Sequence, residues 1–361
     1  MNHPSIYRVI GLMSGTSLDG LDMAYVHFEL QDGKWQFEIQ KTRHLPYGPE
    51  WKQRLQQSIH LSALDLLALN VFYGQWLGAQ LKAFIEHEQL EVDFVASHGH
   101  TVFHQPQQAY TYQIGYGQAI ANGCGQTVVC DFRSLDVLLG GQGAPLVPIG
   151  DQELFGDYDF CLNLGGISNV SFSHQGKRVA FDIGPANMLL NYIVEQLGLT
   201  YDRGGAIAAS GSCKTPLLDK LNQLPYYQLP FPKSLGYEWF LEQILPLFEH
   251  LELEIKDQLA TAVEHVAYQI AAAVLAQTGE RRAKLFITGG GAKNDYLIER
   301  LRDRLGERVE VYIPEELLVD YKEAVVFALM GIKRMRGEVN CLASVTGAER
   351  DCSGGVIYQA G

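Results

Sequence analysis

The chain has 361 residues, of which 47% are hydrophobic and 19% are charged, and its formal net charge is −13. This composition is typical of a folded globular protein and excludes a disordered chain or a coiled coil. The acidic balance argues against a nucleic-acid or anionic-membrane partner, because both need clustered Lys and Arg. At about 150 residues per domain, the length predicts two domains.

No targeting or membrane segment is expected. The first ten residues, MNHPSIYRVI, hold no long apolar run and no cleavage site. The longest apolar stretch, 324–332, is far shorter than the roughly 20 residues that cross a bilayer. We therefore expect a soluble, cytoplasmic protein. The six cysteines include no C-x-x-C pair, so we expect buried or incidental thiols.

A pattern of three strands joined by tight turns occurs twice along the chain. The strands are expected at 7–13, 21–30 and 34–40, and again at 158–164, 168–173 and 178–183. Further strands are expected at 93–97, 126–130 and 284–288, and helices at 61–87, 185–197, 255–277, from near Asn294, and at 322–336.

Strands that alternate with helices in both halves imply an α/β architecture of two similar lobes. We expect an N-terminal lobe over 1–130, joined by 337–361, and a C-terminal lobe over 131–336. Two lobes built on one topology would place a cleft between them, and such clefts commonly hold ligands.

The first candidate site is a turn within the segment GLMSGTSLDGLD, which joins two predicted strands. Glycine lets the backbone approach a phosphate closely, hydroxyl groups donate to it, and an acidic residue can hold the magnesium of a nucleotide. The alternative is an ordinary β-hairpin turn, because hairpins favour the same residues. The residues of this candidate phosphate turn are Gly15, Thr16, Ser17, Leu18, Asp19, Gly20, Leu21 and Asp22.

Two further glycine turns follow strands in the second half. Gly165 and Gly166 repeat the first turn at the matching place, so the two turns could grip one polyphosphate from both sides. In TGGGAKN, residues 289–291 and Asn294 lie between a strand and a helix start, where backbone can cradle a nucleotide. This segment does not fit G-x-G-x-x-G, and the chain has no P-loop, which argues against both of those nucleotide sites.

Asp182, in the segment FDIGPAN, is expected at the end of a strand, with Pro185 at the start of a helix. A carboxylate in that position is well placed as a general base toward a bound hydroxyl or water. The alternative is a helix N-cap, and the two roles are compatible.

Other polar residues leave more than one interpretation open. His98 and His100 lie in the segment SHGHTVFH. No Cys or carboxylate lies nearby at the spacing of metal ligands, so a metal site is disfavoured. Sugar binding and structural hydrogen bonding are the favoured alternatives. Arg133 could hold a carboxylate or phosphate, or form a surface pair with a neighbouring aspartate. Glu323 is expected at the start of the last helix, where an N-terminal carboxylate is the simpler explanation.

Taken in order, these segments resemble the anhydro-N-acetylmuramic acid kinases, a family of the actin, heat-shock ATPase and sugar-kinase superfamily. The resemblance spans nearly the whole chain. One departure is His100, where the family usually has Gln, and it bears on how the sugar side is lined. The segments that carry the resemblance are GLMSGTSLDGLD (11–22), SHGHT (97–101), QIG (113–115), DFR (131–133), GGQGAPLVP (140–148), NLGGISN (163–169), FDIGPAN (181–187), DRGG (202–205), TGGGAKN (288–294) and SVTGA (344–348).

The resemblance implies two lobes of actin-like, ribonuclease-H-like topology with a central cleft. It implies an enzyme that makes N-acetylmuramic acid 6-phosphate from 1,6-anhydro-N-acetylmuramic acid, ATP and water during cell-wall recycling, with Mg²⁺ as a cofactor. Water attacks the anomeric carbon as the internal ether opens, and the freed 6-oxygen takes the γ-phosphoryl group. Positioning and charge neutralisation are expected to supply most of the rate enhancement.

Carried onto this sequence, the resemblance makes Asp182 the general base that activates the water. It makes Gly15–Asp22 the first phosphate turn, Gly165–Gly166 the second, and Gly289–Asn294 the adenosine-side turn. Asp19 is our choice for steering the magnesium. The residues matched to sugar contacts are Ser14, His98, Arg133, Asn187 and Glu323.

Two other functions stay open on the sequence. A nucleotide-dependent switch or filament protein of the same fold would bind and slowly hydrolyse ATP without a sugar. A kinase of the same kind could act on a different amino sugar, because the shape of a pocket sets its specificity. As partners we expect a small amino sugar and ATP, neither nucleic acid nor membrane, and a homodimer if the chain self-associates.

Overall fold

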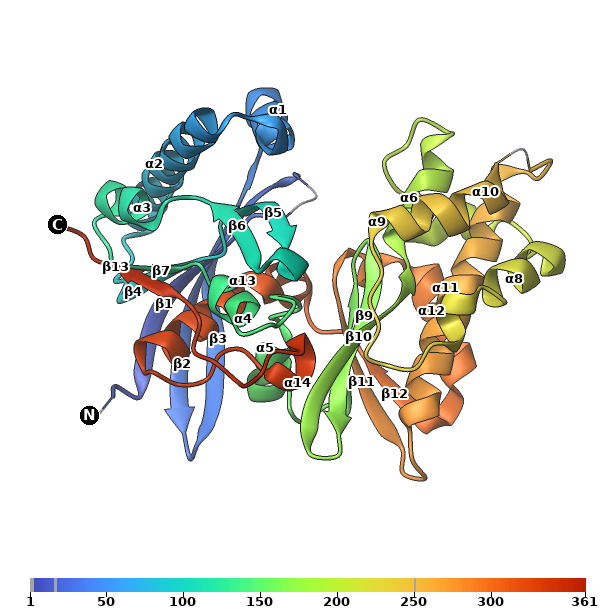
Figure 1. Ribbon diagram of the computed structural model, residues 1–361. Coiled ribbons are helices and arrows are strands. Elements are labelled where there is room, and N and C mark those ends of the chain that lie inside the picture. The colour runs from blue at the N-terminus through green and yellow to red at the C-terminus, as the bar shows by residue number, and fades with distance from the viewer. Residues whose placement is uncertain (1–2, 16–17, 250) are drawn as a thin grey trace. The chain divides into compact units, whose positions relative to one another are not determined.

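The computed structural model describes residues 3–15, 18–249 and 251–361 (Figure 1). The chain forms two compact units: unit 1 comprises the chain up to Leu154 together with Tyr321–Gly361, and unit 2 comprises Phe155–Asp320. The expected boundaries at 131 and 337 therefore differ from the observed ones. Residues 131–154 and 321–336 belong to unit 1 because their apolar side chains, such as Ile149 and Phe327, lie in its core.

Unit 1 is built on a six-stranded sheet. Strands β1, β2 and β3 form an antiparallel meander, β4 and β7 extend it in parallel, and β13 closes the far edge antiparallel to β7. In sheet order the strands are β13 (Val356–Tyr358), β7 (Val128–Cys130), β4 (Phe94–Ser97), β1 (Ile6–Met13), β2 (Gly20–Gln31) and β3 (Lys34–Pro46).

Successive residues of β1 face two different hydrophobic cores. Val9 packs in one core with helix α13 (Glu316–Met335), while Ile10 packs in the other with α2 (Ala63–Glu88). This follows from the two-residue period of a strand. The other elements of unit 1 are α1 (Pro49–Gln57), η1 (Ser58–His60), β5 (His100–Gln105), η2 (Pro106–Gln108), β6 (Tyr110–Ile114), α3 (Gly117–Cys124), α4 (Ser134–Leu138), α5 (Pro148–Leu154) and α14 (Ala343–Thr346).

Unit 2 repeats the arrangement of strands with different residues. Strands β8, β9 and β10 form the antiparallel meander, and β11 and β12 extend it in parallel. In sheet order the strands are β10 (Lys177–Pro185), β9 (Ile167–His174), β8 (Phe160–Leu164), β11 (Ala283–Thr288) and β12 (Val309–Tyr312). The α/β fold and the repeated topology expected from the sequence are thus confirmed.

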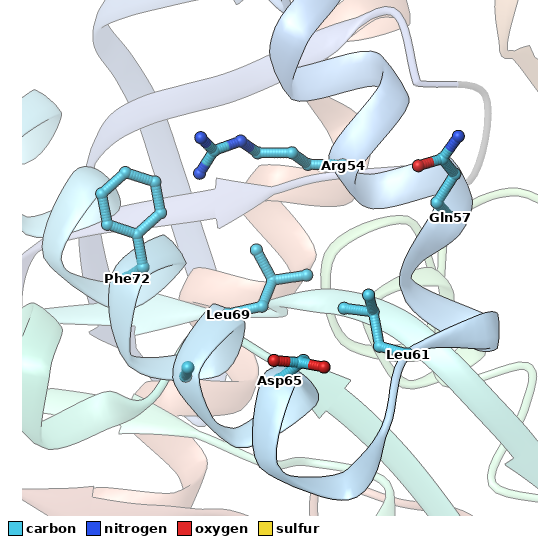
Figure 2. Close-up of a pocket in the computed structure, with 7 residues that line it drawn as sticks. Arg54, Gln57, Leu61, Asp65, Leu69 and Phe72 are labelled. Carbon is cyan, nitrogen blue, oxygen red and sulfur yellow. The ribbon is translucent and has the colours of Figure 1, made fainter.

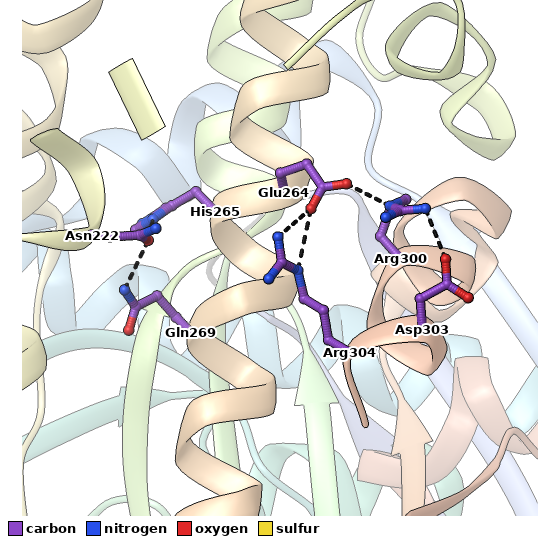
Figure 3. A network of polar contacts seen from close by, with 7 residues as sticks. All are labelled: Asn222, Glu264, His265, Gln269, Arg300, Asp303 and Arg304. Carbon is purple, nitrogen blue, oxygen red and sulfur yellow. Dashed lines mark hydrogen bonds and ion pairs between the residues drawn. The ribbon is translucent and has the colours of Figure 1, made fainter. Parts of the chain in front are cut away.

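Helix α11 (Ile255–Gln277) has the bounds that the sequence predicts. Among the described residues it is the one helix long and apolar enough to cross a membrane, yet 72% of its apolar window is buried, as in the core helix of a soluble domain. Its Glu264 accepts hydrogen bonds from Arg300 and Arg304 of α12 (Asp295–Leu305), which ties the two helices together (Figure 3).

The remaining elements of unit 2 are short, apart from α6, which follows β10. They are α6 (Asn187–Glu195), η3 (Arg203–Gly205), α7 (Ala206–Ala209), α8 (Thr215–Asn222), η4 (Pro225–Gln228), α9 (Tyr237–Trp239), η5 (Phe240–Ile244), α10 (Leu245–Phe248), η6 (Gly290–Lys293) and η7 (Gly306–Arg308).

Two expected element boundaries are wrong in ways that affect the site. Pro185 is the last residue of β10 rather than the first of a helix, and α6 begins at Asn187. Asp182 therefore lies inside the strand, at a shift of register, and is not a helix cap. Helix α13 begins at Glu316, so Glu323 lies about two turns inside it and is not an N-terminal carboxylate.

Candidate functional site

The first candidate phosphate turn leaves the end of β1 in unit 1. Leu18 donates its N–H to the carbonyl of Gly15 at 3.5 Å and has a φ of +57°. Asp19 accepts the N–H of Gly20 through its own carboxylate at 2.9 Å. Both contacts are local to the segment that follows β1, while Thr16 and Ser17 lie outside the described residues.

The far side of this turn is shaped by the pairing of β2 with β3. A Cβ on Gly20 would lie 2.5 Å from the carbonyl oxygen of Leu45, so the close strand contact requires glycine there. Leu21 is only 1% exposed, because it packs into the core that β1 shares with α2. The Asp22 carboxylate pairs with His44 at 2.7 Å.

Helix α13 brings Glu323 to the same neighbourhood. A Cβ on Gly11 would lie 1.9 Å from the carbonyl oxygen of Ala324, so the helix packs directly on the glycine of β1. Burial raises the pKa of the Glu323 carboxyl, and the negative charges of Asp22 and Asp19 raise it further. Unit 1 thus gathers three carboxylates within electrostatic range of one another at the phosphate turn.

Arg133 lies within range of this cluster, and its charge lowers the pKa of Glu323. Its Nη2 and Nε donate to Nε2 of His98 at 2.7 and 3.1 Å, and its Nη1 donates to the carbonyl of Gly143 at 2.6 Å. Asp131 instead accepts a hydrogen bond from Ser134, so the alternative of an aspartate–arginine surface pair is wrong.

The imidazole of His98 is held in one neutral tautomer. Its Nδ1 donates to the Gly99 carbonyl at 2.9 Å, which leaves Nε2 to accept from Arg133. Burial and the charge of Arg133 hold the pKa of His98 well below its usual range. His98 therefore orients the guanidinium without competing with it as a cation.

Asp136 is a supporting residue that the sequence analysis missed. Its carboxylate accepts the N–H of Gly143 at 2.7 Å, the hydroxyl of Thr346 at 2.7 Å and the thiol of Cys341 at 3.1 Å. It thereby fixes the loop whose carbonyl group receives Arg133. A charged residue inside the apolar run LDVLL is the signal that could have identified it.

Among the described residues, no histidine of the segment 97–104 belongs to a group with the spacing of metal ligands. In the described part of the chain, the group with metal-like spacing consists of Asp136, Cys341 and Cys352. The Asp136 oxygens in that group already accept protein hydrogen bonds, so it has the contacts of a structural cluster. Five of the six cysteines are buried and Cys213 is exposed, in agreement with the expectation of buried or incidental thiols.

Ser14 and His100 lie behind the first turn in a buried polar group. The hydroxyl of Tyr47 donates to Ser14 Oγ at 2.8 Å, and Nδ1 of His100 lies 3.5 Å from the same oxygen. Burial lowers the pKa of His100 to about 4. His100 is therefore neutral at neutral pH.

The second candidate phosphate turn, in unit 2, is braced by the start of α6. Gly165 and Gly166 accept the N–H groups of Asn187 and Met188, each at 3.1 Å, and Asn187 Nδ2 donates to the carbonyl of Leu164 at 3.0 Å. Gly166 is exposed, and the nearest atoms to a Cβ there would be 3.8 Å away. The turn is thus held by hydrogen bonds on the side that faces α6, and it is open to solvent at Gly166.

The third glycine turn packs directly against the second. A Cβ on Gly289 would lie 2.6 Å from Oδ1 of Asn163, and one on Gly291 would lie 2.7 Å from Cβ of Leu164. Both contacts require glycine, so this edge of the sheet is formed mainly by backbone atoms. Asn294 is the N-cap of α12 and accepts the N–H of Leu297 at 3.0 Å, which gives it a structural role.

Asp182 is a half-buried carboxylate on the edge strand β10. The Leu235 N–H donates to Oδ2 of Asp182 at 3.1 Å, the hydroxyl of Tyr226 donates to its backbone carbonyl at 2.6 Å, and its own N–H donates to the carbonyl of Lys233 at 3.0 Å. Burial raises the pKa of Asp182 to about 6. The segment 226–235 thus covers the strand edge and holds the carboxylate.

That covering segment is anchored to α11 by a second polar chain. Tyr227 donates its hydroxyl to Nε2 of His265 at 2.8 Å, and Nδ1 of His265 donates to Asn222 Oδ1 at 2.7 Å. Gln269 donates to the same oxygen at 3.0 Å, and Figure 3 shows Asn222 beside His265 and Gln269 of α11. Burial lowers the pKa of His265 to about 3, so this imidazole is neutral.

Among the surface hollows of the described residues, two lie beside elements described above. One, of about 350 Å³, lies between α1 and α2 in unit 1, is lined by residues such as Arg54 and Phe72, and contains none of the predicted site residues (Figure 2). The other, of about 590 Å³, lies along α12 in unit 2 and includes Ala292 of the third glycine turn.

The match to known sequences extends over almost the whole chain: the family model described as anhydro-N-acetylmuramic acid kinase covers residues 7–360. The chain belongs to the anhydro-N-acetylmuramic acid kinase family. The resemblance seen in the sequence segments is thereby confirmed.

Individual relatives agree in length as well as in sequence. The anhydro-N-acetylmuramic acid kinase of Nitrosomonas europaea is 34% identical over 372 residues, covering 97% of this chain and 99% of the relative. That of Xanthomonas oryzae pv. oryzae is 36% identical over 376 residues, covering 100% and 99%. Component A of (R)-2-hydroxyglutaryl-CoA dehydratase from Acidaminococcus fermentans covers 90% of this chain and 96% of its own at 15% identity, with a TM-score of 0.43, too low to support an inference about function.

Proposed function

We propose that this chain uses ATP and water to convert 1,6-anhydro-N-acetylmuramic acid into N-acetylmuramic acid 6-phosphate, in the cytoplasm, as a step of cell-wall recycling. The observation that carries the proposal is the arrangement of unit 2. Asp182 is a half-buried carboxylate with a pKa of about 6 on β10. It belongs to the same antiparallel meander as the open glycine turn, Gly165–Gly166, which joins β8 and β9. Family membership supplies the substrate class.

Asp182 acts as the general base. A carboxyl group with a pKa near 6 is ionised at pH 7.5 and still takes up a proton readily, which suits it to activate water. The activated water forms a bond to the anomeric carbon, and the bond from that carbon to the 6-oxygen breaks. The freed 6-oxygen bonds to the γ-phosphorus, ADP leaves, and the proton of the water passes to Asp182.

Backbone groups hold the polyphosphate. The second turn is open at Gly166 and rigidly braced behind, so phosphate oxygens can approach its N–H groups without displacing a side chain. We assign the first turn, Gly15–Asp22, and the third, Gly289–Asn294, to the nucleotide in the same way. Within the third turn, Asn294 acts by capping α12, which holds the glycines in place.

Mg²⁺ fits the carboxylates of unit 1. Asp19, Asp22 and Glu323 crowd together enough that the first two raise the pKa of the third. A hard divalent cation with oxygen ligands would relieve this repulsion, and we assign Asp19 to hold it, directly or through water. When bound, the ion neutralises charge on the transferred phosphoryl group.

Arg133 suits the acidic part of the sugar. Its guanidinium is oriented by neutral His98 and by the Gly143 carbonyl, and a bidentate pair with a carboxylate is its strongest interaction. The proposed substrate carries a carboxylate on its lactyl ether, which matches this chemistry. We assign Ser14 and Glu323 to the same sugar side, and Asn187 to bracing the second turn.

The decisive experiment measures ADP release by the purified chain with ATP and Mg²⁺. We expect release to depend on the anhydro sugar, with a product heavier than the sugar by one water and one phosphoryl group in mass spectrometry. N-acetylglucosamine serves as the matched control. ATP consumption that no amino sugar changes would refute the kinase and favour a nucleotide switch. A larger stimulation by another amino sugar would replace the substrate.

A second experiment tests the magnesium assignment. Asp19→Asn should raise the Mg²⁺ concentration needed for half-maximal turnover about tenfold, because one charged ligand is lost. Glu86→Gln, on the exposed surface of α2, is the control and should leave that concentration unchanged. An unchanged Mg²⁺ requirement in the Asp19 variant would contradict the assignment.

A further inference from the structure

Three polar residues of unit 2 stand in register across three neighbouring strands. Asn163 of β8 pairs with Asn169 of β9, and Asn169 pairs with Asp182 of β10. Residues directly opposite each other in antiparallel strands project from the same face, with Cβ atoms about 5 Å apart. The three side chains therefore form a polar row on one face of the sheet.

This row lies on the face away from the main core. All three side chains are half-buried, whereas the next row across the same strands, Leu162, Val170 and Phe181, is part of the core. A strand turns alternate side chains to opposite faces, so the pattern is the expected one for a sheet with one functional face. The packing of the core does not require amides in this row.

The two ends of the row have different surroundings. The Asn163 amide lies against both glycine turns: positions for a Cβ on Gly289 and on Gly165 lie 2.6 Å from its Oδ1 and 3.4 Å from its Nδ2. The opposite end is the general base, Asp182. Asn169 thus stands between the residues assigned to the phosphates and the residue assigned to the water.

Asn169 also differs from the buried serines of β9, whose hydroxyl groups make hydrogen bonds within the protein. Its neighbour Ser168 donates to the Gly184 carbonyl at 2.9 Å, and Ser171 accepts from Arg178 at 2.7 Å. Over the described residues, no protein group hydrogen-bonds the carboxamide of Asn169. A half-buried amide with free donors and acceptors beside a general base is available to bind a reacting molecule.

We propose that Asn169 is a catalytic residue that holds the attacking water beside Asp182. The water donates one proton toward the Asp182 carboxylate and the other to the carboxamide oxygen of Asn169. Its lone pairs are then left free for the anomeric carbon. The amide adds no charge, so it orients the water without changing the ionisation of the base. This inference rests on the proposed function.

Asn169→Ala tests the inference by kinetics. We expect kcat to fall about 100-fold, as for a reactant that has lost its orientation, while KM for ATP stays within twofold and the melting temperature is unchanged. Ser173→Ala, an exposed position on the same strand and face, is the matched control and should behave as the wild type. A wild-type kcat in Asn169→Ala would overturn the inference. So would a raised KM for ATP with kcat preserved, because Asn169 would then bind phosphate.

The pH dependence of Asn169→Asp gives a readout that a merely structural role would not move. A carboxylate about one strand spacing from Asp182 raises the pKa of the base, because like charges disfavour ionisation. The acid limb of kcat/KM should therefore move to higher pH by about one unit. Lys233, on the segment that covers the edge of β10, donates to the Tyr226 carbonyl. An acid limb that does not move contradicts the placement of Asn169 beside the base.

The two proposals fail in different ways. If the wild-type chain shows no sugar-dependent ADP release, both the proposed function and the role of Asn169 are refuted. If the wild type turns over and Asn169→Ala turns over equally well, only the role of Asn169 is refuted.

Discussion

Replacing Asp182 with asparagine changes both activity and stability, in opposite directions. The substitution keeps the shape of the side chain and an oxygen that can still accept the Leu235 N–H. The hydrogen bond from Tyr226 to the backbone carbonyl is also kept. What the variant loses is the ability to accept a proton and the negative charge.

The loss of the base should lower turnover about 10²- to 10⁴-fold, the usual contribution of general base catalysis. Binding of ATP should change little, because the phosphate turns are formed by backbone groups of other residues. A kcat within threefold of the wild type would remove Asp182 as the base.

The loss of the charge should stabilise the fold at neutral pH. Burial raises the pKa of Asp182 from 3.8 to about 6. A carboxyl group whose pKa is higher in the folded than in the unfolded state destabilises the fold when it is ionised. This loss of stability is absent below the unfolded pKa and complete above the folded pKa. Two pKa units correspond to about 3 kcal/mol, an upper bound for a half-buried group. We expect Asp182→Asn to raise the free energy of unfolding by about 1–3 kcal/mol at pH 7.5 and to leave it unchanged near pH 4.

Urea unfolding at pH 7.5 and at pH 4 measures this difference. Asp219→Asn, on the exposed face of α8, is the matched control and should change neither stability nor turnover. A variant of Asp182 that is no more stable than the wild type at pH 7.5 would refute the electrostatic reasoning, whatever its activity. A gain that persists at pH 4 would show that the cause is packing rather than charge.

Three other outcomes follow from the geometry. The kcat/KM of the wild type should fall with an acid limb near pH 6, to about one-tenth of its plateau at pH 5, because protonated Asp182 cannot take a second proton. Gly11→Ala should destabilise the protein by about 2 kcal/mol or more in urea unfolding, because its Cβ would lie 1.9 Å from the Ala324 carbonyl oxygen, while Gly48→Ala, with no atom within 4 Å, should not. Gly166→Ala should raise KM for ATP about tenfold with unchanged stability, because the nearest protein atoms are 3.8 Å from its Cβ and only an approaching phosphate is blocked. An unchanged KM in that variant would contradict the phosphate role of the turn.

Local chemistry explains what could be predicted from the sequence. The repeated strand triplets, helix 255–277 and the glycine turns depend on residue periodicity and on the backbone freedom of glycine, both of which can be seen in a few neighbouring residues. Asp182 was identified for the same reason, since the local pattern predicts it at the end of a strand, although β10 extends past it. The boundaries at Pro185 and Glu323 were wrong because β10 and α13 extend beyond the local pattern, stabilised by strand pairing and core packing.

Tertiary structure decided the electrostatics and the neighbours of the site. Asp182 has a pKa of about 6 because residues some 45–55 positions later in the chain cover it. His100 became neutral by burial, and Arg133 was oriented by His98 and a loop held by Asp136. These properties depend on contacts between segments that are far apart in the sequence, and a local sequence pattern cannot predict such contacts.

The row formed by Asn163, Asn169 and Asp182 shows the same division. The sequence by itself determined that two amides and a carboxylate occur in or beside strands of the second meander. Only the pairing register decided that they stand opposite one another, because a shift of a single residue would turn each side chain to the other face. The residue types were set locally, and their alignment into one candidate catalytic surface was set by the fold.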